Sequence, residues 1–219
     1  MPCHKRKSNL WLLLSVLERI AALWVLVMLA PVMLAVAIST AVLSRTSPLI
    51  AHRRLGLGGG PLWVLKFRTM WPRAPRSQYW SARPAVRFAL VEYIVDESGP
   101  REKGVRDHRI SSRFARFCRR HSIDELPQLL HVVRGEMSLV GPRPITDTEW
   151  NLHYRPHAPE VLDVKPGLSG LWQIAGRSRL TYEQRRDLDL ALVRNRSLKL
   201  YFQILLWTLP EIWSGRNAW

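Results

Sequence analysis

The sequence predicts an α+β, mainly helical fold: a re-entrant membrane helix, then a small domain with interfacial amphipathic helices and a short β element. Three observations lead to this prediction: a long apolar stretch near the amino terminus, a shorter one near the carboxy terminus, and a single run typical of a strand. We place the division at residue 44, with the membrane helix in residues 1–44 and a cytosolic, membrane-surface domain in residues 45–219.

The composition favours a polyanionic partner. Lys and Arg total 33 against 17 Asp and Glu, a formal net charge of +16 over 219 residues. Such an excess suits nucleic acid, an anionic membrane face or phosphorylated substrates, and composition alone does not choose among them. The two cysteines, Cys3 and Cys118, do not favour a structural disulfide and indicate a reducing compartment.

The first element is a membrane helix. The stretch from Ile20 to Ser44 carries no charge and exceeds the roughly 20 residues needed to cross a bilayer. A secretory signal fits less well, because the run is too long and no clear cleavage site follows. Basic residues at 5–7 and from Arg45 onward flank the stretch, which favours the cytoplasmic side for both ends. Because Pro31 breaks or kinks a helix, we predict that this one enters the membrane, bends and returns.

A connector, a strand and a loop come next. Residues 45–60 are basic and contain glycines near their end, which lack the spacing of a dinucleotide-binding or phosphate-binding loop and predict a turn. Leu62–Thr69 is apolar and aromatic with a short basic tip, and it predicts a strand. Residues 71–106 are rich in Pro, Arg and Ser with little periodicity, which indicates a loop with short elements.

Two further helices are predicted beside the membrane. In Arg113–Arg120 the side chains of Phe114, Phe117 and Cys118 share one face, with arginines around the rest. This pattern fits a helix in the headgroup region and fits equally a helix docked on a protein core. Leu198–Trp213 is apolar but too short to span a bilayer before its proline, so we predict an amphipathic helix embedded in the membrane surface.

Two adjacent carboxylates mark the candidate site. A helix is predicted to end at Gly135, and Pro127 is tolerated only in its first turn. Asp124 then caps the helix and Glu125 occupies its first position; alternatively, Ser122 is the cap and forms a capping box with Glu125. Amide N–H groups and the helix dipole at that end favour negative charge, on Asp124 as on a substrate phosphate. Such a pair can bind magnesium and one carboxylate can attack phosphorus, although a purely structural cap explains the same pattern.

Stiff basic turns follow the carboxylate pair. In Gly141-Pro142-Arg143-Pro144, two prolines fix the backbone around Arg143, which is a good way to present a phosphate clamp. Residues 165–173 and the pair Gly176-Arg177 repeat this style, with glycine or proline next to a cation. Together with a carboxylate pair and a membrane helix, these turns indicate a phosphate-handling site.

At these residues the chain resembles the bacterial sugar transferases, the monotopic phosphoglycosyl transferases that start polyprenol-linked glycan assembly. The resemblance runs from about residue 17 to about residue 209 and keeps the motifs in family order. The matching segments are Lys66–Met70 (KFRTM), Asp124–Gln128 (DELPQ), Met137–Pro144 (MSLVGPRP), Lys165–Gly170 (KPGLSG), Trp172-Gln173, Gly176-Arg177 and Leu188-Asp189.

The resemblance implies a reaction. In such enzymes the Asp of the Asp-Glu pair attacks the sugar-bearing phosphate of a UDP-sugar, UMP leaves, and undecaprenyl phosphate then takes the phosphosugar; magnesium is required. Asp124 would be the nucleophile and Glu125 its partner, and both would bind Mg²⁺. The other residues that the resemblance assigns to the site are the substrate contacts Lys66, Arg68, Arg143 and Arg177, with Asp189 as a further polar residue.

The resemblance also implies a location and partners. The enzyme would work at the cytoplasmic face of the bacterial inner membrane, among its lipids, and would initiate polysaccharide or glycoconjugate synthesis such as exopolysaccharide or O-antigen. Dimers occur among such enzymes, so a homodimer is an open alternative. Nucleic acid is not expected as a partner, because the aromatic residues form no recognisable stacking platform.

Two competing interpretations stand beside this one. A non-catalytic basic membrane adaptor for anionic lipid or nucleic acid explains the charge and the apolar helix, but it leaves the Asp-Glu pair unexplained. A polytopic sugar-1-phosphate transferase would need several membrane spans, and the sequence offers one candidate.

Several positions depart from the family pattern. Family members usually carry an acidic residue in the first helix near Ala22, a Gly at Ala115 and aromatic residues at Ala191 and Leu192, and often an Asp at Tyr201. These departures bear on membrane seating and sugar choice more than on the reaction, since they lie outside the Asp-Glu and Gly-Pro-Arg-Pro segments.

Overall fold

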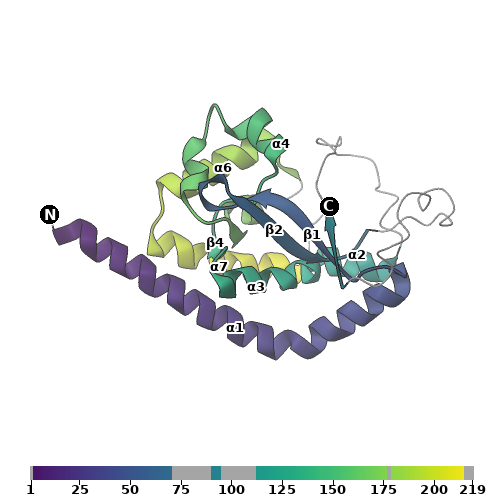
Figure 1. Ribbon diagram of the computed structural model, residues 1–219. Helices are drawn as coiled ribbons and strands as arrows, with labels where there is room; N and C mark the ends of the chain where they lie inside the picture. Colours follow the sequence, from purple (N-terminus) through teal and green to yellow (C-terminus); the bar gives the residue numbers. More distant parts are fainter. Residues whose placement is uncertain (1, 71–89, 95–111, 177–178, 215–219) are drawn as a thin grey trace.

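The computed structural model describes residues 2–70, 90–94, 112–176 and 179–214 (Figure 1). It is mainly helical, as the sequence predicts, and has two small sheets where one short β element was predicted. The α-helices are α1 (Pro2–Ser44), α2 (Arg113–Arg120), α3 (Leu129–Arg134), α4 (Asp147–Glu149), α5 (Leu171–Ala175), α6 (Tyr182–Arg194) and α7 (Leu198–Ser214). Short turns of tighter or wider helix are η1 (Leu57–Gly59), η2 (Ile123–Gln128), η3 (Trp150–Tyr154) and η4 (Pro159–Asp163). The strands are β1 (Leu49–Leu55), β2 (Pro61–Phe67), β3 (Val91–Ile94), β4 (Ser138–Val140) and β5 (Gly167–Ser169).

The long helix α1 runs beneath the rest of the molecule and changes direction part-way along its length (Figure 1). Pro31 lies inside it, where proline removes a backbone donor and crowds the preceding turn. Its apolar side chains are largely unburied: Leu12, Val27 and Val42 are 64%, 62% and 67% exposed. Within the described residues, one helix (Asn9–Ser44) is long and apolar enough to cross a membrane. The core helix of a soluble protein would bury such side chains, so α1 indicates membrane association.

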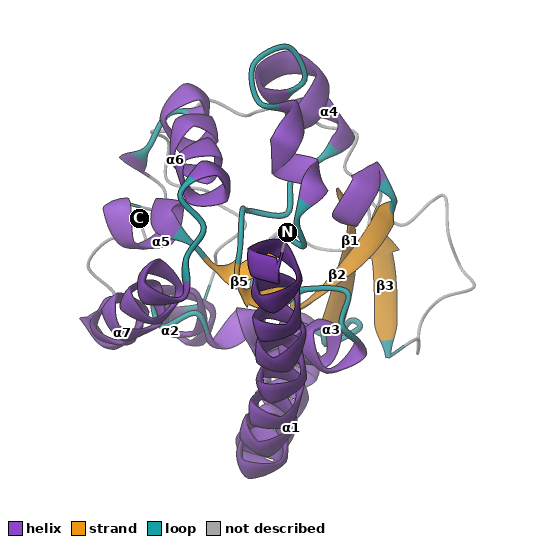
Figure 2. Cartoon of the chain, turned by 90° about the vertical axis from the view of Figure 1, so that its left-hand side faces the viewer, coloured by secondary structure: helices purple, strands orange, loops and turns teal. Residues whose placement is uncertain are grey.

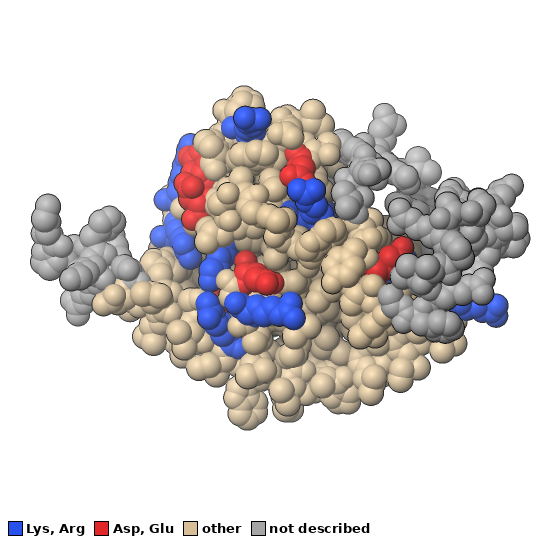
Figure 3. Space-filling model, in the orientation of Figure 1, with Lys and Arg blue, Asp and Glu red and all other residues tan. Residues whose placement is uncertain are grey.

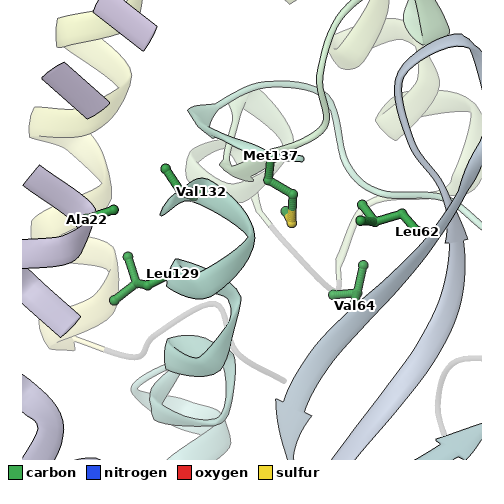
Figure 4. Close-up of a cluster of buried hydrophobic side chains, with 6 residues drawn as sticks. All are labelled: Ala22, Leu62, Val64, Leu129, Val132 and Met137. Carbon is green, nitrogen blue, oxygen red and sulfur yellow. The ribbon is translucent and has the colours of Figure 1, made fainter. Parts of the chain in front are cut away.

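The opposite side of α1 packs on the domain through a small residue (Figure 4). Ala22 is 1% exposed and belongs to one apolar cluster with Leu129 and Val132 of α3, and the cluster continues into β2. The short Ala22 side chain lets α1 approach α3. An acidic side chain at this position, as in the family pattern, would be buried among hydrocarbon groups without a partner.

The buried acidic residue of α1 is Glu18, one turn before Ala22. Its carboxylate accepts hydrogen bonds from Ser138 Oγ (2.6 Å), from Leu139 N (3.2 Å) and from Tyr201 Oη. One side chain therefore joins α1 to β4 and to α7. Our sequence analysis missed this role, although a lone carboxylate inside an apolar helix is a sign of a specific partner.

Strands β1 and β2 form an antiparallel hairpin, and β3 adds to β1 in parallel, which gives the order β2-β1-β3. The strand predicted at 62–69 is confirmed as β2, and the predicted glycine turn is the hairpin loop, where Gly58 and Gly59 have φ angles of 67° and 79°. The segment 71–106 was predicted to be a loop with short elements; most of it lies outside the described residues, and Val91–Ile94 forms one such short element, the strand β3.

The prediction of a plain connector at 45–60 is wrong, because the strand β1 occupies its middle part. Its basic residues concealed the strand period, in which Ala51, Arg53 and Leu55 share one face, with Ala51 and Leu55 buried and Arg53 exposed.

Helix α2 has the predicted bounds, and its cap Ser112 accepts a hydrogen bond from Ala115 N (2.9 Å). The buried residues of α2 are Ala115 and Cys118, and Cys118 packs in a cluster with Val36 of α1. Phe117 is 54% exposed, so the face predicted from Phe114, Phe117 and Cys118 is buried only in part. Two interpretations of this helix were open, a helix in the headgroup region and a helix docked on a protein core. The second describes the face of α2 that carries Ala115 and Cys118.

Helix α7 confirms the predicted amphipathic segment. Tyr201 and Ile204 are buried, whereas Leu206 and Trp207 are 66% and 52% exposed. The helices α2, α3 and α7 lie in one level next to α1, and α4 and α6 lie farthest from it (Figures 1 and 2). Helix α7 therefore lies on the same side of the molecule as α1 (Figures 1 and 2).

The parallel pair β4 and β5 positions the basic turns of the sequence. A Cβ atom added at Gly167 would lie 2.0 Å from Gly141 N, so only glycine allows the two backbones to meet there. Gly167 N also donates to the Pro142 carbonyl (2.8 Å). The loop that carries Arg143 is thereby fixed directly to the strand that follows Lys165.

Candidate active site

A pocket of about 300 Å³ opens beside Asp124. It lies between the β1–β2 hairpin, α2, η2 and α5. The structure brings four of the predicted site residues together there: Asp124, Glu125, Lys66 and Arg143. The other charged or polar residues that line it are His52, Arg54, Thr69, Arg119, Ser122, Gln173 and Arg185.

Asp124 sits in η2, a 3₁₀ turn, and caps no α-helix. The preceding Ser122 has a φ of 55° and makes no side-chain capping bond; Glu125 N donates to the Ser122 carbonyl instead (3.0 Å). Both predicted capping arrangements are therefore wrong. Pro127 has no N–H to continue an α-helix, which favours the tighter turn, and α3 then ends at Gly135 as predicted, with a φ of 77°. The left-handed Ser122 is strained, two residues before Asp124.

The Asp124 carboxyl group is almost completely buried. It is 8% exposed, and this burial raises its pKa to about 6, against the lowering effect of Lys66 and Arg119; Glu125 adds to the rise. At neutral pH the group is ionised but poorly solvated. A carboxylate in this condition is a better nucleophile than one in water, because fewer water molecules must be displaced from it.

Glu125 and Lys66 form an ion pair, with Lys66 Nζ 2.7 Å from Glu125 Oε1. The two adjacent carboxylates fit magnesium, which commonly takes one or two carboxylates and completes its ligands with substrate phosphates and water. The described residues contain no group of three or more His, Cys, Asp or Glu side chains that could hold a metal. A magnesium ion would therefore depend on Asp124, Glu125 and substrate oxygens.

Arg143 is positioned from behind by Asp189. Arg143 N donates to Asp189 Oδ1 (3.2 Å), and Tyr154 Oη donates to Asp189 Oδ2 (2.9 Å). Burial raises the pKa of Asp189 to about 7, although both hydrogen bonds act to lower it. Asp189 is fully buried and does not line the pocket. Its place is thus behind the residue that would touch substrate.

One wall of the pocket carries buried polar atoms without hydrogen-bond partners. The Arg143 guanidinium lies over the Trp172 ring, 4.8 Å from its centroid. Within the described part of the chain, Arg143 Nε, Trp172 Nε1 and Gln173 Oε1 have no partner, and Trp172 and Gln173 are 7% and 3% exposed. Two donors and an acceptor left unpaired at low exposure indicate a polar ligand on this wall.

Sequence reasoning missed four cationic or titratable residues of the pocket: His52, Arg54, Arg119 and Arg185. We read Arg54 as a flank of the membrane helix and Arg119 as part of an amphipathic surface. The available signal was the strand period, because residues two apart lie on the same face of a strand. His52 and Arg54 share one face of β1 with Ile50, and Ile50 is paired with Lys66 across the hairpin. Arg185 left no signal in the sequence pattern.

Of the predicted substrate contacts, Arg68 has other partners. Arg68 Nε donates to the Ser47 carbonyl (2.8 Å), and its Nη2 pairs with Glu92. Arg68 does not line the pocket. Arg177 lies outside the described residues.

Most of the chain matches a known protein family. A family model described as bacterial sugar transferase matches residues 10–215. The chain belongs to the bacterial sugar transferase family. The match covers the pocket, the Gly-Pro-Arg-Pro loop and most of α1, so the resemblance drawn from the motifs is confirmed.

Similar curated proteins carry named activities. The exopolysaccharide production protein ExoY of Sinorhizobium fredii is 37% identical over 172 residues, covering 77% of this chain and 71% of the relative. The UDP-glucose:undecaprenyl-phosphate glucose-1-phosphate transferase of Caulobacter vibrioides is 34% identical over 216 residues, covering 93% and 71%. The undecaprenyl-phosphate galactose phosphotransferase of Salmonella typhimurium is 35% identical over 152 residues, covering 67% of this chain and 29% of the relative.

The position of Asp189 predicts the effect of removing it. Asp189→Ala leaves Arg143 N–H and Tyr154 Oη without an acceptor, and we expect a loss of about 2–3 kcal/mol in the free energy of unfolding. Tyr154→Phe removes one of the two bonds and should cost about 1 kcal/mol. Denaturant unfolding of detergent-held protein measures both. Equal losses in the two variants would contradict the role of Asp189 in holding the Arg143 backbone.

The burial of Asp124 predicts its titration. In magnesium-free protein the carboxyl should be protonated below about pH 6 and ionised above it, whereas an exposed Asp changes near pH 4. Because Lys66 favours the ionised form, Lys66→Met should move the midpoint higher. Infrared difference spectra between wild type and Asp124→Asn across this range measure the carboxyl band. A midpoint near pH 4 would contradict the desolvation of this group.

Proposed function

We propose that this sugar transferase moves a sugar-1-phosphate from a UDP-sugar to undecaprenyl phosphate through a phosphosugar bound covalently to Asp124. The observation that carries the proposal is a desolvated Asp124 beside Glu125 in a pocket rich in cations, next to an exposed apolar helix. The named activities of the relatives from Caulobacter vibrioides and Salmonella typhimurium support the two substrates.

In the first step an Asp124 carboxylate oxygen attacks the phosphorus that bears the sugar. The bond from this phosphorus to the bridging oxygen of the diphosphate breaks, and UMP leaves with the electron pair. Lys66, Arg119 and Arg143 line the same pocket and can neutralise the charge that develops on the phosphoryl oxygens. The partnerless atoms of Trp172 and Gln173 offer a donor and an acceptor to the hydroxyl or amide groups of the donor substrate.

In the second step an oxygen of undecaprenyl phosphate attacks the same phosphorus. The bond to Asp124 breaks, the carboxylate is restored, and a polyprenol-diphosphate sugar forms. One phosphate-binding site thus serves two substrates in turn, which suits a pocket of this size. When bound, magnesium would neutralise the diphosphate at the Asp124–Glu125 pair.

We further propose that α1 enters the cytoplasmic face of the inner membrane, bends and returns to it. Three features support this course: basic flanks on both sides, Pro31 inside the helix, and the change of direction of α1 in Figure 1. The helices α2, α3 and α7 would then lie at the depth of the lipid headgroups. The pocket would open where the phosphate of a polyprenol carrier resides. A purely adaptor role does not account for the convergence of cations on two acidic residues.

The reaction is tested by UMP release. Nanodisc-held protein, undecaprenyl phosphate, magnesium and a panel of UDP-sugars should give UMP with at least one donor. Asp124→Asn should lower the rate on the order of a thousandfold or more, and a chelator should abolish it. Asp187→Asn, which changes an exposed carboxylate in the same way, should leave the rate unchanged.

The covalent step has its own readout. Without acceptor, the wild type should release one UMP per active site, and mass spectrometry should find the phosphosugar on the peptide that contains Asp124. Multiple turnover by Asp124→Asn, or a label on another residue, would show that the covalent mechanism assigned to Asp124 is wrong.

The course of α1 is tested by cysteine labelling. Asn9→Cys and Leu57→Cys, each in a Cys3→Ser/Cys118→Ser background, place one thiol on either side of the apolar stretch. An impermeant maleimide should label neither in intact spheroplasts and both after permeabilisation. Labelling of one site from outside would contradict the re-entrant course and indicate a single span.

A further inference from the structure

A second group of cations lies beside α1, away from the pocket. It consists of Arg19, Lys165 and Arg196, which we call the interfacial cation cluster. None of the three lines the pocket beside Asp124. Figure 3 shows basic side chains gathered just above the lower surface of the molecule, which α1 forms and which carries no charge in this view.

The cluster lies at the depth expected for lipid phosphates. Arg19 is the last charged residue before the uncharged stretch 20–44, and Arg45 is the first charged residue after it. In a helix that enters and returns, these two residues mark the boundary between headgroups and hydrocarbon. Arg196 lies beside the part of α1 before Pro31, which also carries Arg19, because its guanidinium is 3.9 Å from the ring centroid of Trp11.

Arg19 lies against the turn that ends α3. A Cβ atom added at Gly135 would lie 2.2 Å from Arg19 Nη2, so the guanidinium packs directly against the Gly135 backbone. Gly135, against which Arg19 packs, lines a hollow of about 420 Å³ together with Lys165. Lys165 and Arg196 line a second, smaller hollow together. Partial burial, together with the charges of Arg19 and Arg196, lowers the pKa of Lys165, as expected for cations held close together.

The acidic residues nearby are already engaged. Glu18 is buried and accepts hydrogen bonds from Ser138, Leu139 and Tyr201. Glu136, which lines the hollow, is bonded to His131 Nδ1 (2.5 Å). Three cations therefore face a single buried carboxylate and one exposed carboxylate that has its own partner, which leaves the cluster with surplus positive charge.

We infer that the interfacial cation cluster binds the phosphate of an anionic phospholipid headgroup. A guanidinium and an ammonium side by side match a phosphodiester, since arginine can hold two of its oxygens at once. Below Arg19, Leu23 and Val27 follow at successive turns of the same helix face and are 48% and 62% exposed. They provide an apolar track for the acyl chains, which a free phosphate would not use. The inference rests on the proposed membrane seat of α1 and not on the transfer reaction.

The test is retention of lipid by the full-length protein. Protein in mixed micelles is offered phosphatidylglycerol, phosphatidylcholine or inorganic phosphate, and native mass spectrometry counts the bound molecules. We expect the wild type to retain phosphatidylglycerol in preference to the other two. Arg19→Gln/Lys165→Gln should lower that retention roughly tenfold, as should Lys165→Gln/Arg196→Gln, which leaves α1 unchanged.

A charge-matched control separates a site from general attraction. Arg53→Gln/Arg155→Gln removes the same charge near α4, on the side of the molecule away from α1, where Arg53 pairs with Asp147 (3.7 Å). It should leave retention unchanged. Equal losses in the control and cluster variants, or equal retention of phosphatidylcholine, would overturn the inference. The assay contains no UDP-sugar, so its outcome is independent of whether UMP is released.

Discussion

The packing of α1 on α3 is the constraint on which the site depends. α3 follows η2 without a break, so the turn that carries Asp124 is fixed by the same apolar cluster that holds Ala22. A change in the depth of the membrane helix would move Asp124 with it. This coupling matters for an acceptor such as a polyprenol phosphate, because the reactive phosphate of a lipid stays at the headgroups. The proposed chemistry requires a carboxyl at a set height above the hydrocarbon, and the α1–α3 contact supplies it.

The charges around Asp124 reconcile two opposing demands. Burial removes water from the carboxyl and works against its ionisation, while Lys66 and Arg119 favour the ionised form. The same cations lower the repulsion between this carboxylate and an approaching diphosphate. At about 4 Å two like charges repel by about 1 kcal/mol in water and by several times more in a partly buried site. A pocket with two carboxylates can therefore accept a polyanion only when cations outnumber them, as they do here.

The parts of the fold set by local pattern were predictable. The apolar helix, α2, α7, β2 and the stop at Gly135 follow from periodicity and from glycine chemistry. The local motifs indicated Asp124, Glu125 and Arg143, and the family resemblance added Lys66; all four line one pocket. The errors have physical reasons. β1 was hidden because its solvent-facing and pocket-facing positions are both basic, and the capping predictions assumed an α-helix where Pro127 favours a 3₁₀ turn. The resemblance assigned Asp189 to the site, but the order of residues along a chain does not show whether a side chain lines a pocket or lies behind its wall.

Two departures from the family pattern become one feature when Glu18 is considered. The family pattern has acidic residues near Ala22 and at position 201. In this chain the acidic residue is Glu18, one turn earlier in α1, and the Tyr201 hydroxyl donates a hydrogen bond to it. Burial and the neighbouring Glu18 raise the pKa of Tyr201, so it remains a hydrogen-bond donor. With Ser138 Oγ and Leu139 N it gives the buried carboxylate three neutral hydrogen-bond donors. In this chain Glu18 and Tyr201 therefore join α1 to α7, and the departures at Ala22 and Tyr201 do not argue against the proposed course of α1.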